Sequence, residues 1–235
     1  MSKLDAFPIT KLWPAEHPDR IQLYGLPTPN GAKVSMALEE MGLPYEPHLV
    51  DIMKDANKAP EYVALNPNAK IPCILDPDGP GGEPLFLVES NNILLYLAEK
   101  TGKLIPADAA GRLEARSWLF FQAAHIGPMF GQIGFFNKFA GKAIEDKRPL
   151  ERYVNESKRL LKVLDERLTG RTWLLGDAFS IVDIAHLGWV RNLIGFYEAG
   201  ELVEFDSYTQ VKRWLEAGLA RPGVQKGLTT PARPA

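Results

Sequence analysis

Cysteine is nearly absent from this chain of 235 residues, and its scarcity excludes two kinds of chemistry. Cys73 is the single cysteine, so neither an internal disulfide nor a redox-active Cys-x-x-Cys pair can form within the chain. A protein that has no disulfide fits a reducing compartment. We therefore expect a cytoplasmic protein that does not use a cysteine pair of its own.

Net charge and long apolar runs are scarce as well. The 27 basic side chains are balanced by 29 acidic ones, so neither nucleic acid nor an anionic membrane is expected as a partner. No apolar run approaches the ~18 residues of a spanning helix. Residues 1–19 lack the apolar core of a secretory signal. The histidines are scattered and no cluster has metal-ligand spacing, so we expect no metal.

Strand and helix patterns alternate over the first hundred residues. Residues 1–20 carry three prolines and no periodicity, which predicts an irregular arm. Beyond the arm, the patterns predict the order β-α-β-(α)-β-β-α, with a turn-rich stretch that makes the last two strands an antiparallel hairpin. The predicted strands are 21–24, 45–50, 74–75 and 86–88, and the predicted helices are 31–41, 60–65 and 90–100.

The strand signals stop near residue 106, and only helical spacing follows. Ser180 and Asp183 fit a capping box, for which we expect a structural role. The predicted helices are 112–126, 149–168, 180–192 and 207–217. The fold class is therefore α/β plus all-α, with an arm over 1–20, an α/β domain over 21–103 and an all-helical domain over 107–228.

Ile71-Pro72 stands just ahead of the third predicted strand. Proline cannot donate to a β-ladder, so it belongs at the start of a strand or at its rim. A cis bond here would turn the chain sharply and expose the N–H and C=O of Ile71. These groups could then hold an extended peptide by strand addition. The alternative is a loop around an ordinary trans proline.

Glu89-Ser90 marks the junction between the fourth strand and its helix. The unpaired N–H groups of a helix N-terminus, together with the Ser90 hydroxyl, would hold a carboxylate. Glu89 would attract an ammonium group. This combination suits the α-amino-acid end of a ligand. The alternative is that Ser90 is only an N-cap and Glu89 only complements the helix dipole.

Thr28-Pro29-Asn30-Gly31 lies between the first strand and the first helix, where a redox Cys-x-x-Cys would lie in a thioredoxin-like unit. Here a hydroxyl and an amide replace the thiols. They would stabilise a thiolate brought by a ligand and lower its pKa, helped by the helix dipole. Asn30 could also serve as the N-cap while Pro29 fixes the entry turn, and the two roles are compatible.

These three segments, in this order, make the chain resemble the glutathione transferases, and within them the nu-class group of bacterial disulfide-bond reductases. The resemblance implies a thioredoxin-like N-terminal domain with a mixed four-stranded sheet, an all-helical C-terminal domain and a homodimer. It implies reduced or oxidised glutathione as cosubstrate and a small-molecule disulfide or electrophile as second substrate. It also implies that Thr28 and Asn30 act in catalysis as contacts to the thiol.

The resemblance assigns the rest of the glutathione molecule residue by residue. Its cysteinyl backbone would pair with Ile71, Asn57 would reach its glycine end, and Arg152 would reach a second glutathione from the helical domain. Lys33 and Lys70 are basic and near the site, either as contacts or as solvated side chains. The implied glutathione-binding residues are Asn57, Lys70, Ile71, Pro72, Glu89, Ser90 and Arg152.

Two reactive side chains near these segments invite a different interpretation. Tyr24 could hydrogen-bond a thiolate, but we assign it to packing; Cys73 we take as a buried and inert thiol. Aromatic residues over 127–130 and 135–139 either line an apolar pocket for the second substrate or form ordinary helical core.

The leading hypothesis is glutathione-dependent thiol–disulfide chemistry, with conjugation or peroxide reduction as side activities. The glutathione thiolate is the nucleophile, because the chain offers no cysteine for that role. One alternative is a glutathione-binding regulatory module with little turnover. Another is a conjugating transferase in which Tyr24 activates the thiol.

Overall fold

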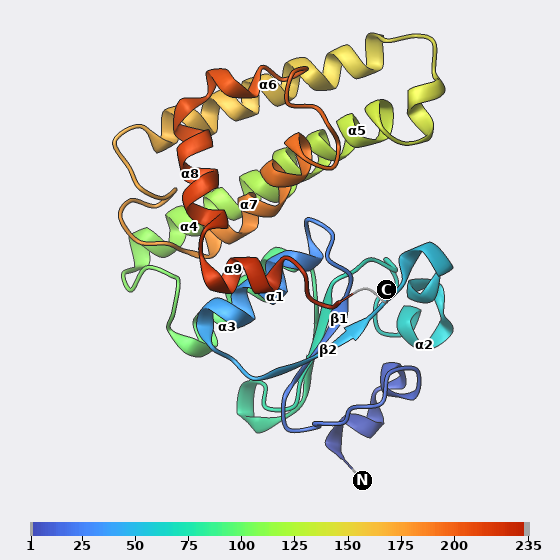
Figure 1. Ribbon diagram of the computed structural model, residues 1–235. Helices are drawn as coiled ribbons and strands as arrows, with labels where there is room; N and C mark the ends of the chain where they lie inside the picture. The colour runs from blue at the N-terminus through green and yellow to red at the C-terminus, as the bar shows by residue number, and fades with distance from the viewer. Residues whose placement is uncertain (1, 233–235) are drawn as a thin grey trace. The chain divides into compact units, whose positions relative to one another are not determined.

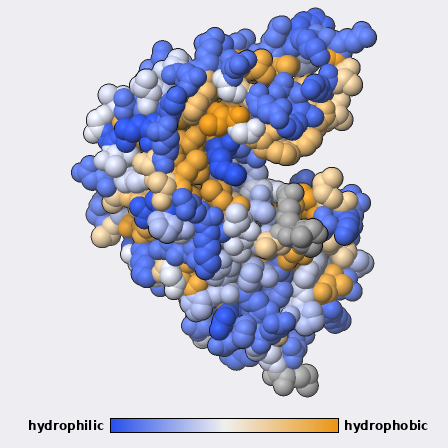
Figure 2. Space-filling model, in the orientation of Figure 1, coloured by the Kyte–Doolittle hydropathy of each residue, from blue (hydrophilic) through white to orange (hydrophobic). Residues whose placement is uncertain are grey.

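The computed structural model describes residues 2–232, shown as a ribbon in Figure 1. The chain forms two compact units. The first unit contains the chain up to Thr101 together with the segment that begins at Pro222, and the second unit is Gly102–Arg221. The face of the molecule in Figure 2 is mostly hydrophilic, with separate hydrophobic areas. Within the described residues, no helix is both long and apolar enough to cross a bilayer.

The first unit is built on a mixed four-stranded sheet in the order β2-β1-β3-β4. The strands are β1 (Ile21–Gly25), β2 (Tyr45–Leu49), β3 (Cys73–Asp76) and β4 (Leu85–Val88). β1 pairs with β2 in parallel, while β3 pairs antiparallel with both β1 and β4. The predicted β-α-β opening and the predicted hairpin are therefore confirmed.

Helices α1 and α3 pack against this sheet, and α9 packs against α1 (Figure 1). Their bounds are Gly31–Met41 for α1, Ser90–Thr101 for α3 and Pro222–Gly227 for α9, while the short α2 (Pro60–Val63) lies elsewhere in the same unit. Gly42 ends α1 in the left-handed region, at φ 69°. The alternating β and α pattern places the start of α1 directly after β1 and the start of α3 directly after β4.

The C-terminal helix α9 belongs to the first unit, whereas the sequence placed residues up to 228 in the helical domain. The Ser35 hydroxyl donates to the carbonyl of Gly227 across 2.6 Å. A Cβ at Gly227 would lie 2.4 Å from the Met36 nitrogen, so only glycine permits this close approach. The first boundary also lies earlier than predicted, between Thr101 and Gly102.

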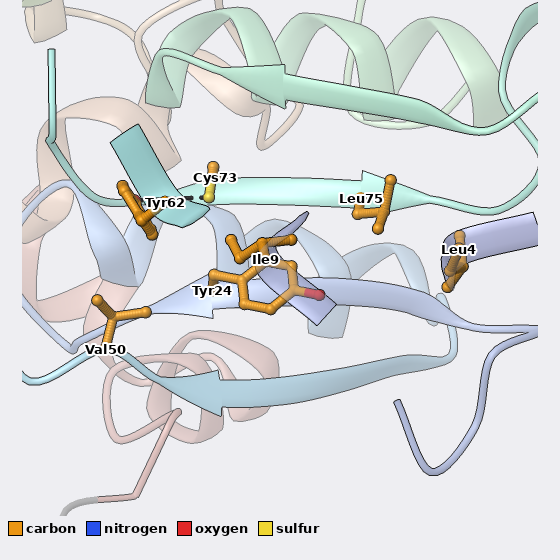
Figure 3. Packing of buried hydrophobic residues seen from close by; sticks show 7 residues of the cluster. All are labelled: Leu4, Ile9, Tyr24, Val50, Tyr62, Cys73 and Leu75. Atoms are coloured by element: carbon orange, nitrogen blue, oxygen red, sulfur yellow. Dashed lines mark hydrogen bonds between the residues drawn. The ribbon is translucent and has the colours of Figure 1, made fainter. Parts of the chain in front are cut away.

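The N-terminal arm is ordered and contributes to the core, so the prediction of an irregular surface arm is wrong. It forms two 3₁₀ helices, η1 (Lys3–Ala6) and η2 (Pro8–Lys11). The Trp13 indole N–H donates to the carbonyl of Leu49 at 3.0 Å. Figure 3 shows the buried cluster that the arm completes, which consists of Leu4, Ile9, Tyr24, Val50, Tyr62, Cys73 and Leu75.

The second unit is all-helical, as predicted. Its helices are α4 (Ala109–Phe121), α5 (Gly127–Asn137), α6 (Arg148–Leu168), α7 (Ile181–Ile194) and α8 (Thr209–Leu219). A π-helical turn over Gln122–Ile126 joins α4 to α5, so the predicted helix over 112–126 continues to Asn137. Pro128, which has no N–H to donate, is tolerated at the start of α5, directly after this wider turn.

The predicted capping box of α7 is present and has a structural role. The backbone N–H of Ser180 donates to Asp183 Oδ2 at 3.0 Å, and the Ser180 hydroxyl oxygen accepts from the N–H of Val182 at 3.2 Å. The other oxygen of Asp183 accepts from the Trp214 indole at 2.9 Å. Burial raises the pKa of Asp183, although these hydrogen bonds oppose the rise.

Candidate functional site

Strand register brings three of the predicted segments to one end of the sheet. Tyr24 pairs with Cys73, and Cys73 pairs with Val88. The residues that follow β1, precede β3 and follow β4 therefore meet at the same end. A Cβ at Gly25 would lie 3.6 Å from the Pro72 side chain, which shows how closely β1 passes this loop. The segments that contain Thr28, Ile71-Pro72 and Glu89-Ser90 thus lie at one end of the sheet.

The Ile71-Pro72 peptide bond is cis, so the alternative of a loop around an ordinary trans proline is wrong. Pro72 is buried and directly precedes β3, while Ile71 is half-buried. Among the described residues, the backbone of Ile71 makes no hydrogen bond to another backbone group. Within residues 2–232, its N–H and C=O therefore remain available to an extended ligand.

The loop before Ile71 is fixed by side chains that sequence reasoning did not single out. The Tyr62 hydroxyl donates to the carbonyl of Lys70 at 2.7 Å, and the Asn66 amide donates to the same carbonyl at 2.8 Å. The Asn57 amide donates to the carbonyl of Ala69 at 2.7 Å. Asn57 therefore supports this loop, and its own Oδ1 is buried without a partner among the described residues. The Lys70 side chain is exposed, in agreement with the solvated alternative.

The start of α1 is capped by Thr28 and not by Asn30. The N–H of Gly31 donates to the Thr28 hydroxyl oxygen at 3.1 Å, whereas Asn30 makes no side-chain cap hydrogen bond. The prediction of an Asn30 cap is therefore wrong. A Cβ at Gly31 would lie 1.8 Å from the carbonyl oxygen of Leu26, so the turn requires glycine. Because the Thr28 oxygen accepts this bond, its hydroxyl proton can be donated to a ligand.

The start of α3 combines an unusual backbone with a buried cation. Glu89 is exposed and lies in the left-handed region, at φ 67°, while Ser90 is buried. The Lys33 ammonium donates to the Ser90 hydroxyl oxygen at 3.2 Å and to Asn91 Oδ1 at 2.9 Å. Lys33 is only 1% exposed, so the interpretation of it as a solvated side chain is wrong. Burial lowers the pKa of Lys33 to about 7, and the Glu89 carboxylate opposes this shift.

Tyr24 and Cys73 belong to the core, as expected, since both are fully buried. Burial raises the pKa of Tyr24 well above its usual value and that of Cys73 to about 12. The thiol donates to the Tyr62 hydroxyl at 3.5 Å (Figure 3). The Tyr24 hydroxyl is buried and has no hydrogen-bond partner among the described residues. Neither group is placed to activate a ligand thiol.

The residues predicted for the second substrate lie in the second unit. Phe130 is buried core, whereas Phe135 and Phe139 are exposed. Phe136 stacks on Tyr153 of α6 at 5.7 Å between ring centroids. Arg152, next to Tyr153 on α6, is exposed.

No metal centre is evident in residues 2–232, since no group of three or more His, Cys, Asp or Glu side chains there could hold an ion. Polar groups, one buried ammonium and two helix N-termini therefore make up the candidate site. Such a site suits an extended ligand with a carboxylate at one end and an anionic centre beside α1.

Comparison with known proteins gives a consistent result over nearly the whole chain. Residues 28–100 match the family described as glutathione S-transferase, N-terminal domain, and residues 126–222 match the glutathione S-transferase, C-terminal domain. The disulfide-bond oxidoreductase YfcG of Escherichia coli strain K12 is 41% identical over 209 residues, which cover 88% of this chain and 94% of that protein.

Two solved structures are similar in both fold and sequence. A glutathione transferase from Burkholderia graminis, with two glutathione molecules bound per subunit, has a TM-score of 0.98 and 64% identity, covering 100% of this chain and 98% of that one. A glutathione transferase from Pseudomonas putida, with one glutathione disulfide per subunit, has a TM-score of 0.95 and 58% identity, covering 97% and 99%.

Proposed function

Because this chain belongs to the glutathione S-transferase family, we propose that it is a glutathione-dependent disulfide-bond reductase in which the glutathione thiolate is the nucleophile. The observation that carries this proposal is the position of the only cysteine. Cys73 is fully buried and the pKa of its thiol is raised to about 12, while the start of α1 presents a hydroxyl and an amide. The reacting sulfur therefore comes from the ligand.

The proposed binding mode follows the end of the sheet. The cysteinyl backbone of glutathione pairs with the N–H and C=O of Ile71 beside cis-Pro72. The γ-glutamyl carboxylate meets Ser90 and the start of α3, with Glu89 toward the ammonium group. The thiol then lies near Thr28 and Asn30. Lys70 and Asn57 flank the glycine end, Asn57 through its support of the Ala69 carbonyl.

The proposed reaction needs two glutathione molecules for each disulfide. The first thiolate attacks one sulfur of the substrate disulfide, which forms a mixed disulfide and releases a thiolate that takes up a proton. The second thiolate attacks the glutathione sulfur of the mixed disulfide, which yields glutathione disulfide and the second substrate thiol. The Thr28 hydroxyl and the α1 dipole favour the thiolate in the first step.

Arg152 is proposed to contact the second glutathione, and the chain is proposed to be a nu-class member. Support comes from the Burkholderia graminis structure, which holds two glutathione molecules per subunit, and from the disulfide-bond oxidoreductase name of the Escherichia coli relative. Reaction of the same thiolate with electrophiles would be a side activity of this site.

We also propose a homodimer in the cytoplasm. Leu113 and Phe120 are 62% and 72% exposed and lie seven residues apart on α4, so they share one helix face. Exposed apolar faces of this kind mark interaction surfaces. Light scattering would support the dimer with a mass near twice 26.1 kDa and would contradict it with a mass near 26.1 kDa.

The decisive assay mixes the purified protein with glutathione and a small disulfide, coupled to glutathione reductase and NADPH. Wild-type protein is expected to accelerate NADPH consumption over buffer, and Cys73→Ala is expected to keep that rate within about twofold, since Cys73 is buried and inert. A rate equal to buffer would contradict the reductase and favour a binding module. Loss of the rate in a folded Cys73→Ala protein would contradict the cysteine-free mechanism.

A further inference from the structure

Lys33 is a buried basic residue of α1 that has no role in the reaction proposed above. It is the third residue of α1, its side chain is buried, and its ammonium contacts Ser90 and Asn91, the first two residues of α3. A charge removed from water to this extent is costly unless its environment compensates it. Part of this compensation is polar, because Ser90 Oγ and Asn91 Oδ1 accept hydrogen bonds from the ammonium at 3.2 and 2.9 Å.

The hydrogen bond between Lys33 and Ser90 has a direction that depends on charge. An ammonium has three donors and no acceptor, so Ser90 can only accept from it, and the serine proton is then free to point at a ligand. A neutral amine has a lone pair and can take the Ser90 proton for itself. Protonation of Lys33 thus decides whether the Ser90 hydroxyl donates to the ligand or to the protein.

We propose that Lys33 is a positioning residue for the γ-glutamyl carboxylate, because its ammonium supplies a buried positive charge and turns the Ser90 hydroxyl toward the ligand. This inference rests on the proposed function for the identity of the ligand. It predicts that glutathione binding takes up a proton at Lys33, since a bound carboxylate favours the ammonium form.

The surroundings of Lys33 support this coupling. Burial brings its pKa to about 7, so the two charge states are both populated at neutral pH. The Glu89 carboxylate raises the pKa of Lys33. Glu89 directly precedes Ser90, which is proposed to bind the ligand carboxylate. Two other lysines on packed helices have carboxylate partners: Lys100 with Asp76 at 2.8 Å, and Lys226 with Glu39 at 3.0 Å. The titratable side chains on the elements packed against α1 are Tyr24, Tyr96, Glu99, Lys100 and Lys226, and Glu89 directly precedes α3.

The test uses S-methylglutathione, which has no thiol to titrate, and isothermal titration calorimetry between pH 6 and 8.5. Wild-type protein is expected to bind about tenfold more weakly at pH 8.5 than at pH 6, as Lys33 loses its proton. At pH 7.5, titrations in two buffers of different ionisation enthalpy should show uptake of between about half a proton and one proton on binding.

The variants separate positioning from a merely structural role. Lys33→Met keeps the aliphatic stem and is expected to bind about tenfold more weakly at pH 6. Its affinity should not change between pH 6 and 8.5, and it should take up no proton through this position. Lys33→Arg, which cannot lose its proton, should likewise show no pH dependence. Ser90→Ala should reduce the effect of Lys33→Met, because the lysine acts partly through that hydroxyl.

Two results would contradict the proposed role of Lys33 without contradicting the proposed function. One is wild-type binding with no proton uptake, which needs no variant and so does not depend on folding. The other is a folded Lys33→Met protein that keeps the wild-type affinity and pH profile. By contrast, wild-type protein that fails to bind S-methylglutathione at any pH would contradict the proposed function itself, and the inference with it.

Discussion

Two sets of chemically capable side chains lie within the first unit and behave in opposite ways. Thr28 and Ser90 stand at the starts of α1 and α3, and each hydroxyl oxygen accepts a hydrogen bond from the protein. Tyr24 and Cys73 lie in the core with raised pKa values. The serine and threonine hydroxyls, which are weaker acids than a tyrosine phenol or a cysteine thiol, are therefore the groups that can reach a ligand. This difference indicates that the ligand has to supply the reactive thiolate, because the Cys73 thiol of the protein is buried.

The two helix starts also differ from each other. Thr28 accepts from the backbone N–H of Gly31, which keeps its proton at any pH of interest. Ser90 accepts from the Lys33 ammonium, which can lose its proton near neutrality. The thiol end of the site should therefore be insensitive to the charge state of the protein, while the carboxylate end should respond to pH.

The largest expected effect comes from Thr28→Ala, which removes the proposed donor to the thiolate. Turnover in the coupled disulfide assay should fall by about 100-fold, the scale found when one donor to a developing anion is deleted. Thr169→Ala, a matched change at an exposed threonine, should leave turnover unchanged. Wild-type turnover in a folded Thr28→Ala protein would show that Thr28 has no role in the reaction. It would also contradict the proposed difference between the helix-start hydroxyls and the buried Tyr24 and Cys73.

The next effect concerns stability and sharpens the contrast between the helix starts. The pKa of Lys33 is about 7 in the folded protein and about 10.4 in an unfolded chain, so between these values the unfolded state binds more protons. The free energy of unfolding should therefore rise with pH, by about 2 kcal/mol between pH 7 and 9. Urea denaturation of wild-type and Lys33→Met proteins at pH 7, 8 and 9 measures this contribution as the difference between them. Parallel pH profiles would show that Lys33 is not buried as a titrating amine.

The smallest effect is expected from Tyr24→Phe. Its hydroxyl is buried and has no hydrogen-bond partner among the described residues, so its removal should leave stability unchanged or raise it by up to about 1 kcal/mol. Turnover should stay within about twofold of wild type. A large loss of turnover, with an intact melting transition, would instead support the phenol as the group that activates the thiol.

Much of the first unit could be predicted because its signals are local. Alternating apolar residues marked the strands, glycines and turn residues marked their ends, and the register then placed the three site segments together. The arm was missed because its 3₁₀ helices have no long period and Leu4 and Ile9 are buried by tertiary packing alone. The position of α9 depends on the fit of Gly227 against Met36, which no local pattern contains.

The site was predicted at the level of segments and less well at the level of contacts. Thr28 took the capping role expected of Asn30, because its hydroxyl, three residues before Gly31, reaches that N–H. Lys33 was undervalued because lysine is usually solvated. A signal existed, since Lys33 directly precedes Val34, the first residue of the apolar stripe in the sequence of this helix. The hydrogen bonds from Tyr62 and Asn66 to the Lys70 carbonyl had no sequence signal beyond their polar character.

The central claim is that Thr28 and the start of α1, and not a buried side chain, stabilise the thiolate of bound glutathione. The most direct measurement is the pKa of the bound thiol, followed by the ultraviolet absorbance of the thiolate as pH is raised. Wild-type and Tyr24→Phe proteins should both lower this pKa below that of free glutathione, and Thr28→Ala should return it toward the free value. A thiol pKa that rises in Tyr24→Phe and stays low in Thr28→Ala would contradict the account.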